Sequence, residues 1–341
     1  MKRVLLLLTC LLVLLCSACQ GAGAQKSISA SLEPDSVIDE DIDKSMAYEL
    51  LRDKLFHNGF DLSGFDSTDL SKVVIGDITY GGTAAGKRYW RIDQWGCKNN
   101  LAYSTGEESG DLWIQSDASK EIRINRETGE LSMVLNTSEE YVDENGEHRA
   151  RQYGENWPCL LLTEFTNIAR IGDMEHLFMS VSFRINSVEN KMPQGTFDES
   201  LHSAQFQWYI TPQDYDRTTR QFGDMFWFGM PFYDYRYEEI PEFSAVDGGK
   251  NDASGKYIYM MEGTDVFERG SATIGKVEMI SLDVLPWIYR AFELGQKEGF
   301  LSGVDLDDMV ISSTNIGWEV PGTFDIDMDL FDLSLQVVWK K

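Results

Sequence analysis

Apolar and acidic residues alternate without exception along residues 324–330. A period of two places one set of side chains on a buried face and the other set in water, which is typical of a strand with one face on a core. Beyond Leu330 and Phe331 the apolar residues continue on the opposite parity, at Leu333 and Leu335. This slip by one residue predicts a β-bulge near Leu330 and Phe331.

Many other short segments with the same period follow one another along the chain, and sequences typical of tight turns separate them. They do not alternate with helical segments, which excludes a parallel α/β sheet. Helical spacing of apolar residues predicts two helices, over residues 39–56 and over residues 282–298, the second ended by Gly299. We therefore predict an all-β fold: a large antiparallel jelly-roll sandwich with one N-terminal helix and one helix in the C-terminal half.

The first 18 residues combine a basic start, an apolar run and small residues, which together predict a signal peptide for export. The apolar run is shorter than the ~20 residues that a membrane-spanning helix needs. Residues 15–19 resemble the bacterial lipobox, with Cys16 as a departure from the usual pattern. The resemblance implies lipidation of Cys19 and an acyl anchor in the bilayer of a bacterial cell envelope. The alternative is ordinary cleavage before Gln25 and secretion.

Residues 19–36 are small and polar, and we interpret them as a flexible tether. Residues 37–341 contain no Pro-rich linker and no fixed repeat, so we predict one sandwich domain that includes the N-terminal helix. The 43% hydrophobic content excludes a disordered chain. The formal net charge of −26 excludes nucleic acid as a partner, because such a body repels a phosphate backbone.

Two cysteines, Cys97 and Cys159, lie outside the predicted signal region. An exported protein meets an oxidising compartment, so these two can form one disulfide. The alternative is two separate buried thiols. The sequence has no CxxC motif and no His/Cys cluster, which excludes a structural zinc site.

Asp325, Asp327 and Asp329 share one face of the predicted last strand. Three like charges at alternate positions repel each other unless water, Lys or Arg side chains, or a cation lies between them. Calcium prefers carboxylate oxygens and is plentiful outside cells, so these residues are candidates for a structural Ca²⁺ site.

Aromatic residues are densest in residues 205–209 and 226–237, where polar residues accompany them. Sugars stack on aromatic rings and form hydrogen bonds with neighbouring polar groups, so this mixture indicates a glycan-binding groove. The alternative is that these aromatics fill the sandwich core. The candidate ligand-binding residues are Trp208, Trp227, Tyr233, Asp234, Arg236 and Trp318.

Glycoside hydrolysis needs two carboxylates on either side of a sugar-binding cleft. The compact motif Glu-x-Asp-x-x-Glu, which places them on one strand in some sandwich glycosidases, is absent from this sequence. Glu319 is the catalytic candidate, because an aromatic residue precedes it at the end of a predicted strand. Asp224, Asp234 and Glu262 are other carboxylates on aromatic-rich segments.

Three segments resemble secreted bacterial proteins of the concanavalin A-like jelly-roll type, a group that includes carbohydrate-binding modules. They are residues 157–162, residues 226–236, and residues 317–322 together with 332–335. The resemblance implies a sandwich with a glycan-facing surface and names no catalytic residue.

The expected function is therefore that of a surface-tethered lipoprotein that binds a polysaccharide or glycoconjugate. One alternative is a glycoside hydrolase or polysaccharide lyase with paired carboxylates. The other is a non-catalytic envelope module that binds a protein partner.

Overall fold

The computed structural model describes residues 46–65, 72–80, 87–248 and 253–341. The predicted signal peptide, the tether and Cys19 lie outside the described residues. The described residues belong to one compact unit.

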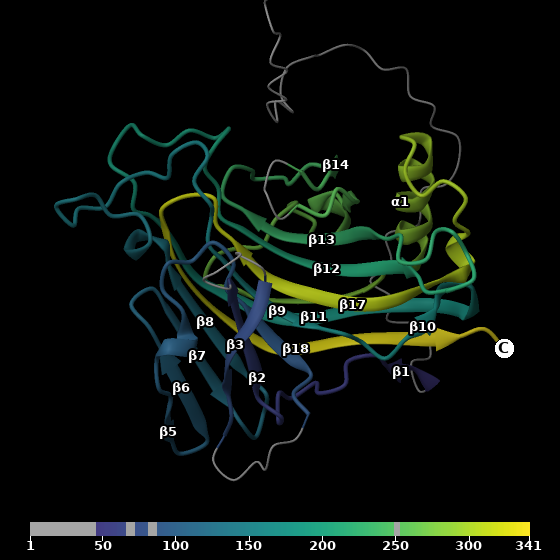
Figure 1. Cartoon of the computed structure of the whole chain (residues 1–341), viewed down its shortest axis with the longest axis horizontal. Helices are drawn as coiled ribbons and strands as arrows, with labels where there is room; N and C mark the ends of the chain where they lie inside the picture. The colour runs from purple at the N-terminus through teal and green to yellow at the C-terminus, as the bar shows by residue number, and fades with distance from the viewer. Residues whose placement is uncertain (1–45, 66–71, 81–86, 249–252) are drawn as a thin grey trace, which may run out of the picture. The chain divides into compact units, whose positions relative to one another are not determined.

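Within the described residues, the strands form one eight-stranded and one ten-stranded sheet (Figure 1). The first sheet has the order β16-β11-β18-β8-β7-β6-β5, with β1 also paired to β18. Its strands are β1 (Tyr48–Glu49), β5 (Glu107–Ser109), β6 (Leu112–Ser116), β7 (Lys120–Asn125), β8 (Leu131–Asn136), β11 (Met174–Asn190), β16 (Val277–Asp283) and β18 (Phe324–Trp339).

The second sheet has the order β14-β15-β13-β12-β17-β9-β4-β2-β3, with β10 also paired to β17. Its strands are β2 (Phe60–Phe65), β3 (Lys72–Ile78), β4 (Trp90–Asp93), β9 (Cys159–Glu164), β10 (Ala169–Arg170), β12 (Gln205–Asp214), β13 (Phe226–Asp234), β14 (Phe243–Val246), β15 (Tyr257–Met260) and β17 (Met309–Glu319). Short 3-10 helices connect some strands: η2 (Leu101–Tyr103), η3 (Thr137–Glu139), η4 (Ile171–Asp173), η5 (Gly263–Asp265) and η6 (Leu306–Asp308).

The two sheets pack face to face through large apolar side chains. Phe183 of β11 meets Phe206 of β12 with ring centroids 5.0 Å apart. The indole N–H of Trp318 on β17 lies 2.8 Å from Sδ of Met328 on β18. The predicted all-β sandwich of the jelly-roll kind is therefore confirmed. It differs from a purely antiparallel fold in two pairs, β2 with β4 and β13 with β15, which run parallel.

Strands β11 and β18 form the longest pairing in the described part of the first sheet. Ser182 pairs with Asp332, and the next residue, Phe183, pairs with Leu330, so Phe331 has no partner in the ladder. This is the predicted bulge. It keeps both Leu330 and Leu333 buried on the core side, although they are an odd number of residues apart.

The predicted C-terminal helix is present as α1 (Leu285–Lys297). Pro286 lies in its first turn, and Gly299 follows its end with a φ of 92°. The helix begins later than predicted, because β16 extends to Asp283. No helix among the described residues combines the length and the apolar character that crossing a membrane requires.

The predicted N-terminal helix over residues 39–56 is wrong for the part of this range that the structure describes. Residues 39–45 lie outside the described residues, and residues 47–56 form β1 and a series of turns. The apolar residues that suggested a helical face are buried by the sandwich instead: Leu50 and Leu51 lie in the core, and the Leu50 N–H donates to the Leu335 carbonyl. Pairing with β18 therefore overrides the local helical pattern.

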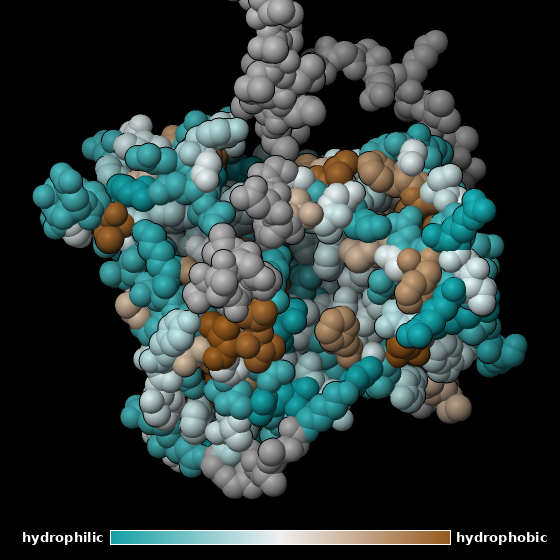
Figure 2. Space-filling view, in the orientation of Figure 1, coloured by the Kyte–Doolittle hydropathy of each residue, from teal (hydrophilic) through white to brown (hydrophobic). Residues whose placement is uncertain are grey.

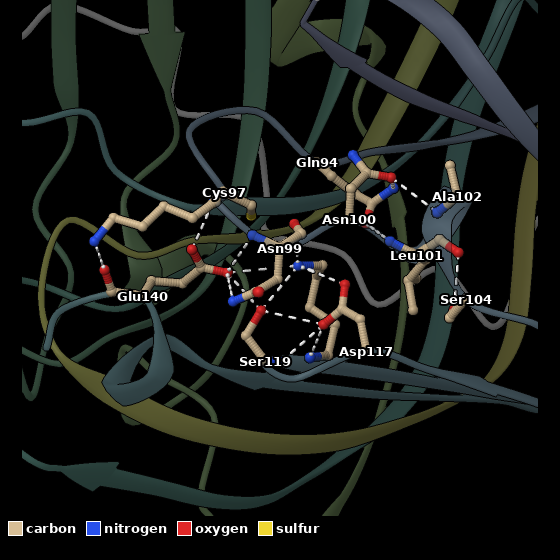
Figure 3. A network of polar contacts seen from close by, with 12 residues as sticks. Gln94, Cys97, Asn99, Asn100, Leu101, Ala102, Ser104, Asp117, Ser119 and Glu140 are labelled. Atoms are coloured by element: carbon tan, nitrogen blue, oxygen red, sulfur yellow. Dashed lines mark hydrogen bonds and ion pairs between the residues drawn. The ribbon is translucent and has the colours of Figure 1, made fainter. Parts of the chain in front are cut away.

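A buried polar network joins the start of β7 to the segment before η2 (Figure 3). Figure 3 shows Asp117, Ser119 and Glu140 converging on one point. Lys120, whose side chain is fully buried, places Nζ 3.0 Å from Asp117 Oδ2 and 2.8 Å from the Asn99 carbonyl oxygen. A buried ammonium is stable only when it is paired in this way.

Glu164 at the end of β9 is a buried carboxylate, and no cationic side chain among the described residues forms an ion pair with it. Its Oε1 accepts the Arg52 backbone N–H at 2.7 Å, and its buried Oε2 has no hydrogen-bond partner within residues 46–65, 72–80, 87–248 and 253–341. Burial raises the pKa of Glu164 to about 7, and the backbone bond and charge of Arg52 only partly oppose this. The neighbouring charges of Asp53 and Glu49 act in the same direction as burial.

We expect Trp318→Ala to lower the free energy of unfolding by about 3–5 kcal/mol, because it empties a fully buried site between the sheets. Trp339→Ala, at the end of β18 where the side chain is 37% exposed, is the matched control and should cost less than about 1 kcal/mol. Urea unfolding followed by tryptophan fluorescence measures both. Equal effects of the two substitutions would contradict the burial of Trp318.

We expect stability to fall as the pH rises from about 4.5 to about 7, by roughly 1–3 kcal/mol from Glu164 alone. In that window the folded protein keeps a proton on Glu164 that the unfolded chain releases, so folding is favoured at the acidic end. Glu164→Gln should remove this part of the pH dependence, whereas Glu268→Gln, at an exposed position, should leave it unchanged. Denaturant midpoints at several pH values measure it, and identical profiles for wild type and Glu164→Gln would refute the assignment.

Candidate functional site

The central strands β12 and β17 divide their side chains between a core side and an open side. Phe206, Trp208 and Trp318 point into the core and are fully buried. Because neighbouring residues alternate in direction, Gln207 and Glu319 point to the opposite side of the sheet. This opposite side of the second sheet contains the candidate site.

Strand pairing arranges the open side in rows. Tyr209 stands opposite Asn315 on β17 and opposite Gly229 on β13. Asn315 in turn stands opposite Thr163 on β9, which stands opposite Arg91 on β4. We call the open side of β13, β12, β17, β9 and β4 the polar face. Its residues are Trp227, Gly229, Pro231, Gln205, Gln207, Tyr209, Ser313, Asn315, Gly317, Glu319, Cys159, Leu161, Thr163, Arg91 and Asp93.

The middle of the polar face carries short side chains. Gly317 stands opposite Gln207 and Leu161, and a Cβ added there would meet the Leu160 carbonyl oxygen at 2.2 Å. A Cβ added at Gly229 would meet the Tyr209 ring at 2.5 Å. Backbone atoms and a positive φ require glycine at position 317, whereas at position 229 a larger residue would displace the Tyr209 and Met260 side chains. The absence of a side chain at both positions makes the middle of the face lower than its borders. Figure 2 shows the surface hollowed over β12, β13 and β17, between raised parts on either side.

An aromatic pair borders the face on the β13 side. The rings of Tyr209 and Trp227 meet edge to face with centroids 6.3 Å apart, and both side chains are half-buried. The Trp227 indole N–H lies 3.5 Å from Ser254 Oγ. Burial, and to a smaller extent the charge of Glu319, raises the pKa of Tyr209, so its hydroxyl stays protonated. The pair offers apolar ring surface beside a hydroxyl that can donate.

Glu319 lies half-buried at the end of β17. Its Oε2 lies 3.5 Å from the Gln207 side-chain nitrogen, and its Oε1 lies 3.7 Å from the Cys159 sulfur. Among the residues that the structure describes, Glu319 forms no ion pair. The carboxylate is thus held by two weak neutral contacts and keeps acceptor capacity for a ligand.

Asp234 and Arg236 form a tight ion pair at the same end of the face. Arg236 binds Asp234 through Nε at 2.9 Å and Nη2 at 2.6 Å, and Ser203 and Gln205 also donate to this carboxylate. Burial acts to raise the pKa of Asp234, but the hydrogen bonds and charge of Arg236, with Ser203, outweigh it and lower the pKa. Asp234 is therefore an ionised residue whose oxygens are already used by the protein.

Asp93 and Arg91 make a second internal pair at the opposite border, on β4. Arg91 Nε lies 2.5 Å from Asp93 Oδ1, and Thr163 donates to Asp93 Oδ2 at 2.6 Å. Ser63 also donates to this carboxylate from the neighbouring strand β2. The pair leaves the β4 border polar and close to neutral.

The six predicted ligand-binding residues lie partly on the polar face and partly in the core. Trp227 borders the polar face, and Asp234 and Arg236 lie at its end. Tyr233 is half-buried and packs its ring against Trp318 at 6.0 Å. Trp208 and Trp318 are wrong as ligand contacts: both are fully buried, and the Trp208 indole N–H donates to Thr314 Oγ1 at 2.6 Å.

Sequence reasoning did not select Tyr209, Asn315, Thr163 or Asp93. Tyr209 could have been found, because it alternates with Phe206, Trp208 and Ile210, which are all apolar, and therefore lies on the same side of the strand as Gln207. Asn315, Thr163 and Asp93 join the face only through pairing between strands that are far apart in the sequence.

The three aspartates of β18, Asp325, Asp327 and Asp329, form their hydrogen bonds with side chains of the protein. Asp329 accepts from Ser132, Arg184 and Asn186, and Asn186 also donates to Asp327. Asp325 accepts from Ser138 at 2.6 Å and lies 3.6 Å from Lys191 Nζ. In the described part of the chain, no group of three or more carboxylate, His or Cys side chains is arranged to hold a metal ion. The calcium site predicted at Asp325, Asp327 and Asp329 is therefore not supported.

The two cysteines predicted to pair are neighbours but are not bonded to each other. Cys97 is a free thiol whose sulfur lies 3.5 Å from the Cys159 carbonyl oxygen. Burial raises the pKa of Cys97 to about 12, which keeps it in the unreactive thiol form. The alternative reading of two separate thiols fits this structure, and the predicted disulfide does not.

Two hollows elsewhere on the described surface offer less chemistry. The larger, about 600 Å³, is lined by residues that include Arg149, Arg151 and His202. Arg149 is paired with Glu155, and Arg151 donates to the backbone carbonyls of Glu155 and Leu201. The other, about 500 Å³, lies beside Met174, Tyr289 and the C-terminal lysines. The charged groups of the larger hollow serve the fold, so the polar face is the candidate site.

No family model and no curated protein matches the sequence. Among solved structures, a native family 12 xyloglucanase from Bacillus licheniformis is 12% identical, covers 69% of this chain and 100% of its own, and gives a TM-score of 0.40. Endoglucanase Cel12A from Rhodothermus marinus is 10% identical, with coverages of 70% and 97% and a TM-score of 0.35. An endo-1,4-β-glucanase, CelB2, is 13% identical, with coverages of 69% and 96% and a TM-score of 0.36. At these distances similarity assigns neither activity nor substrate to this chain.

Proposed function

We propose that this protein is exported, anchored to the bacterial cell envelope through Cys19, and binds a polysaccharide or glycoconjugate on the polar face. The observation that supports this most is the composition of a sheet face that lies opposite the core among the residues the structure describes. It combines an aromatic border, a floor lowered by Gly229 and Gly317, and polar groups with free hydrogen-bonding capacity.

Each part of this face suits sugar chemistry. The apolar faces of sugar rings stack on aromatic side chains such as Trp227 and Tyr209, and their hydroxyls exchange hydrogen bonds with amides and carboxylates such as Asn315 and Glu319. Five strands at about 4.8 Å spacing make the face roughly 19 Å wide. A face of this width suits an oligosaccharide better than a single sugar ring.

A second function, glycosidic-bond cleavage, is favoured by the placement of two carboxylates. Glu319 and Asp234 both pair with Gln205, one from each side, so they point to the same side of the sheet. Their backbones are two strand spacings apart, about 10 Å. Inverting glycosidases place their carboxyl groups about 6.5–9.5 Å apart, with an acid on one side and a base on the other. In this hypothesis the two carboxylates are those of Glu319 and Asp234, and Asp234 takes part only when a ligand displaces Arg236 from it.

We expect Trp227→Ala and Tyr209→Ala each to weaken glycan binding about fivefold or more, because each removes about 1 kcal/mol of stacking contact. Affinity electrophoresis in gels containing a panel of neutral polysaccharides measures retention. Tyr48→Ala, which removes a 51% exposed aromatic from the first sheet, is the matched control and should retain full binding. Unchanged retention in both polar-face variants would remove this face as the binding site.

If the protein cleaves the glycan it binds, Glu319→Gln should lower the rate of reducing-end formation by about 100-fold or more, because it removes one of the two carboxylates that the reaction needs. Binding of the intact glycan should remain measurable in this variant. Asp327→Asn, on the first sheet, is the matched carboxylate control and should keep full turnover. Wild-type protein that retains glycan without forming new reducing ends would leave binding as the function.

A further inference from the structure

The charges on the polar face are almost all neutralised within the protein. Asp93 is paired with Arg91 at 2.5 Å, and Asp234 is paired with Arg236 at 2.6 Å. Beyond the β4 border, Asp61 on β2 is paired with Arg88 at 2.5 Å. These pairs contribute little net charge to a ligand on the face.

Glu319 is the exception in the described part of this face. In the part of the chain that the structure describes, its carboxylate has hydrogen-bond contacts with the neutral Gln207 amide and the Cys159 thiol, at 3.5 and 3.7 Å. Neither contact neutralises its negative charge. A cationic group on a ligand would form a stronger, charge-assisted hydrogen bond here than a hydroxyl would.

The aromatic border adds a second attraction for a cation. The charge of Glu319 contributes to the raised pKa of Tyr209, so the two side chains lie within electrostatic reach of each other. Aromatic rings attract cations through the negative faces of their π systems. Tyr209 and Glu319 therefore favour the same kind of ligand group.

The charge of the whole chain points in the same direction. A formal net charge of −26 attracts cationic ligands over a distance and repels polyanions. No arginine of the polar face is left to receive a uronate carboxylate, because Arg91 and Arg236 are each paired with an aspartate.

From these observations we infer that the polar face prefers a glycan that carries free ammonium groups, such as a de-N-acetylated hexosamine polymer, and that Glu319 receives the ammonium. This inference rests on the proposed glycan-binding function and specifies its ligand class. The ammonium of one sugar unit donates to the Glu319 carboxylate, while another ring of the same glycan chain stacks at the Tyr209 and Trp227 border.

The test compares two oligosaccharides that differ in whether their amino groups are free or acetylated: the β-1,4-linked hexamer of glucosamine and its fully N-acetylated form. Calorimetric titration of the full-length protein at mildly acidic pH keeps the amines charged. We expect the amine form to bind about tenfold more tightly in low salt. The ratio should shrink in about 0.5 M NaCl, because a half-exposed ion pair is screened.

The matched variants are Glu319→Gln and Glu268→Gln. The first should bring the ratio of the two affinities close to one, because it keeps the shape and removes the charge. The second removes the same charge from an exposed position outside the face and should keep the wild-type ratio. Thermal unfolding midpoints confirm folding, and the wild-type ratio tests the inference even if Glu319→Gln does not fold.

Equal binding of both hexamers by wild type, or tighter binding of a hexagalacturonate, would overturn the ammonium preference and leave glycan binding standing. Binding of no oligosaccharide in the neutral, cationic and anionic set would overturn the proposed function together with the inference. A preference that survives in Glu319→Gln would overturn the role of Glu319.

Discussion

The fold depends on aromatic packing between the two sheets. Phe206, Trp208 and Trp318 are buried on the core side of the second sheet, and Phe183 of the first sheet packs against Phe206. A buried indole is stable only if its N–H has a partner, and Trp208 finds one in the hydroxyl of Thr314. Because these large side chains occupy the core parity of β12 and β17, the other parity of the same strands is left for polar residues. The core thereby positions the candidate site.

The first sheet gives the second a continuous surface to pack on. The pairing of β11 with β18 extends almost the whole length of both strands, and the bulge at Phe331 lets the apolar residues on its two sides share the core face. The same register turns Asp327 and Asp329 away from the core. Arg184 donates a hydrogen bond to Asp329 there, and Asn186 donates one to Asp327. The acidic side chains of β18 are thus part of the outer surface of the sheet and need no metal ion.

Much of this could be predicted from the sequence. The alternation along residues 324–330 predicted both the strand and its bulge, and the helix near residues 282–298 was also recognised, since these signals are local. The helix over residues 39–56 failed over its described part, because β18 offered Leu50 a strand partner that no local pattern reveals. The aromatic segments were recognised as important, but two of the selected tryptophans, Trp208 and Trp318, belong to the core.

The sequence by itself determined the strand periodicity, and hence the all-β class, because alternation is a property of neighbouring residues. It also determined the acidic charge, which restricts the ligands that can approach. Only the tertiary structure decided which parity of each strand is covered. A period of two assigns residues to two faces without saying which face meets the other sheet. For the same reason, Asn315, Thr163 and Asp93 become neighbours only when β17, β9 and β4 pair.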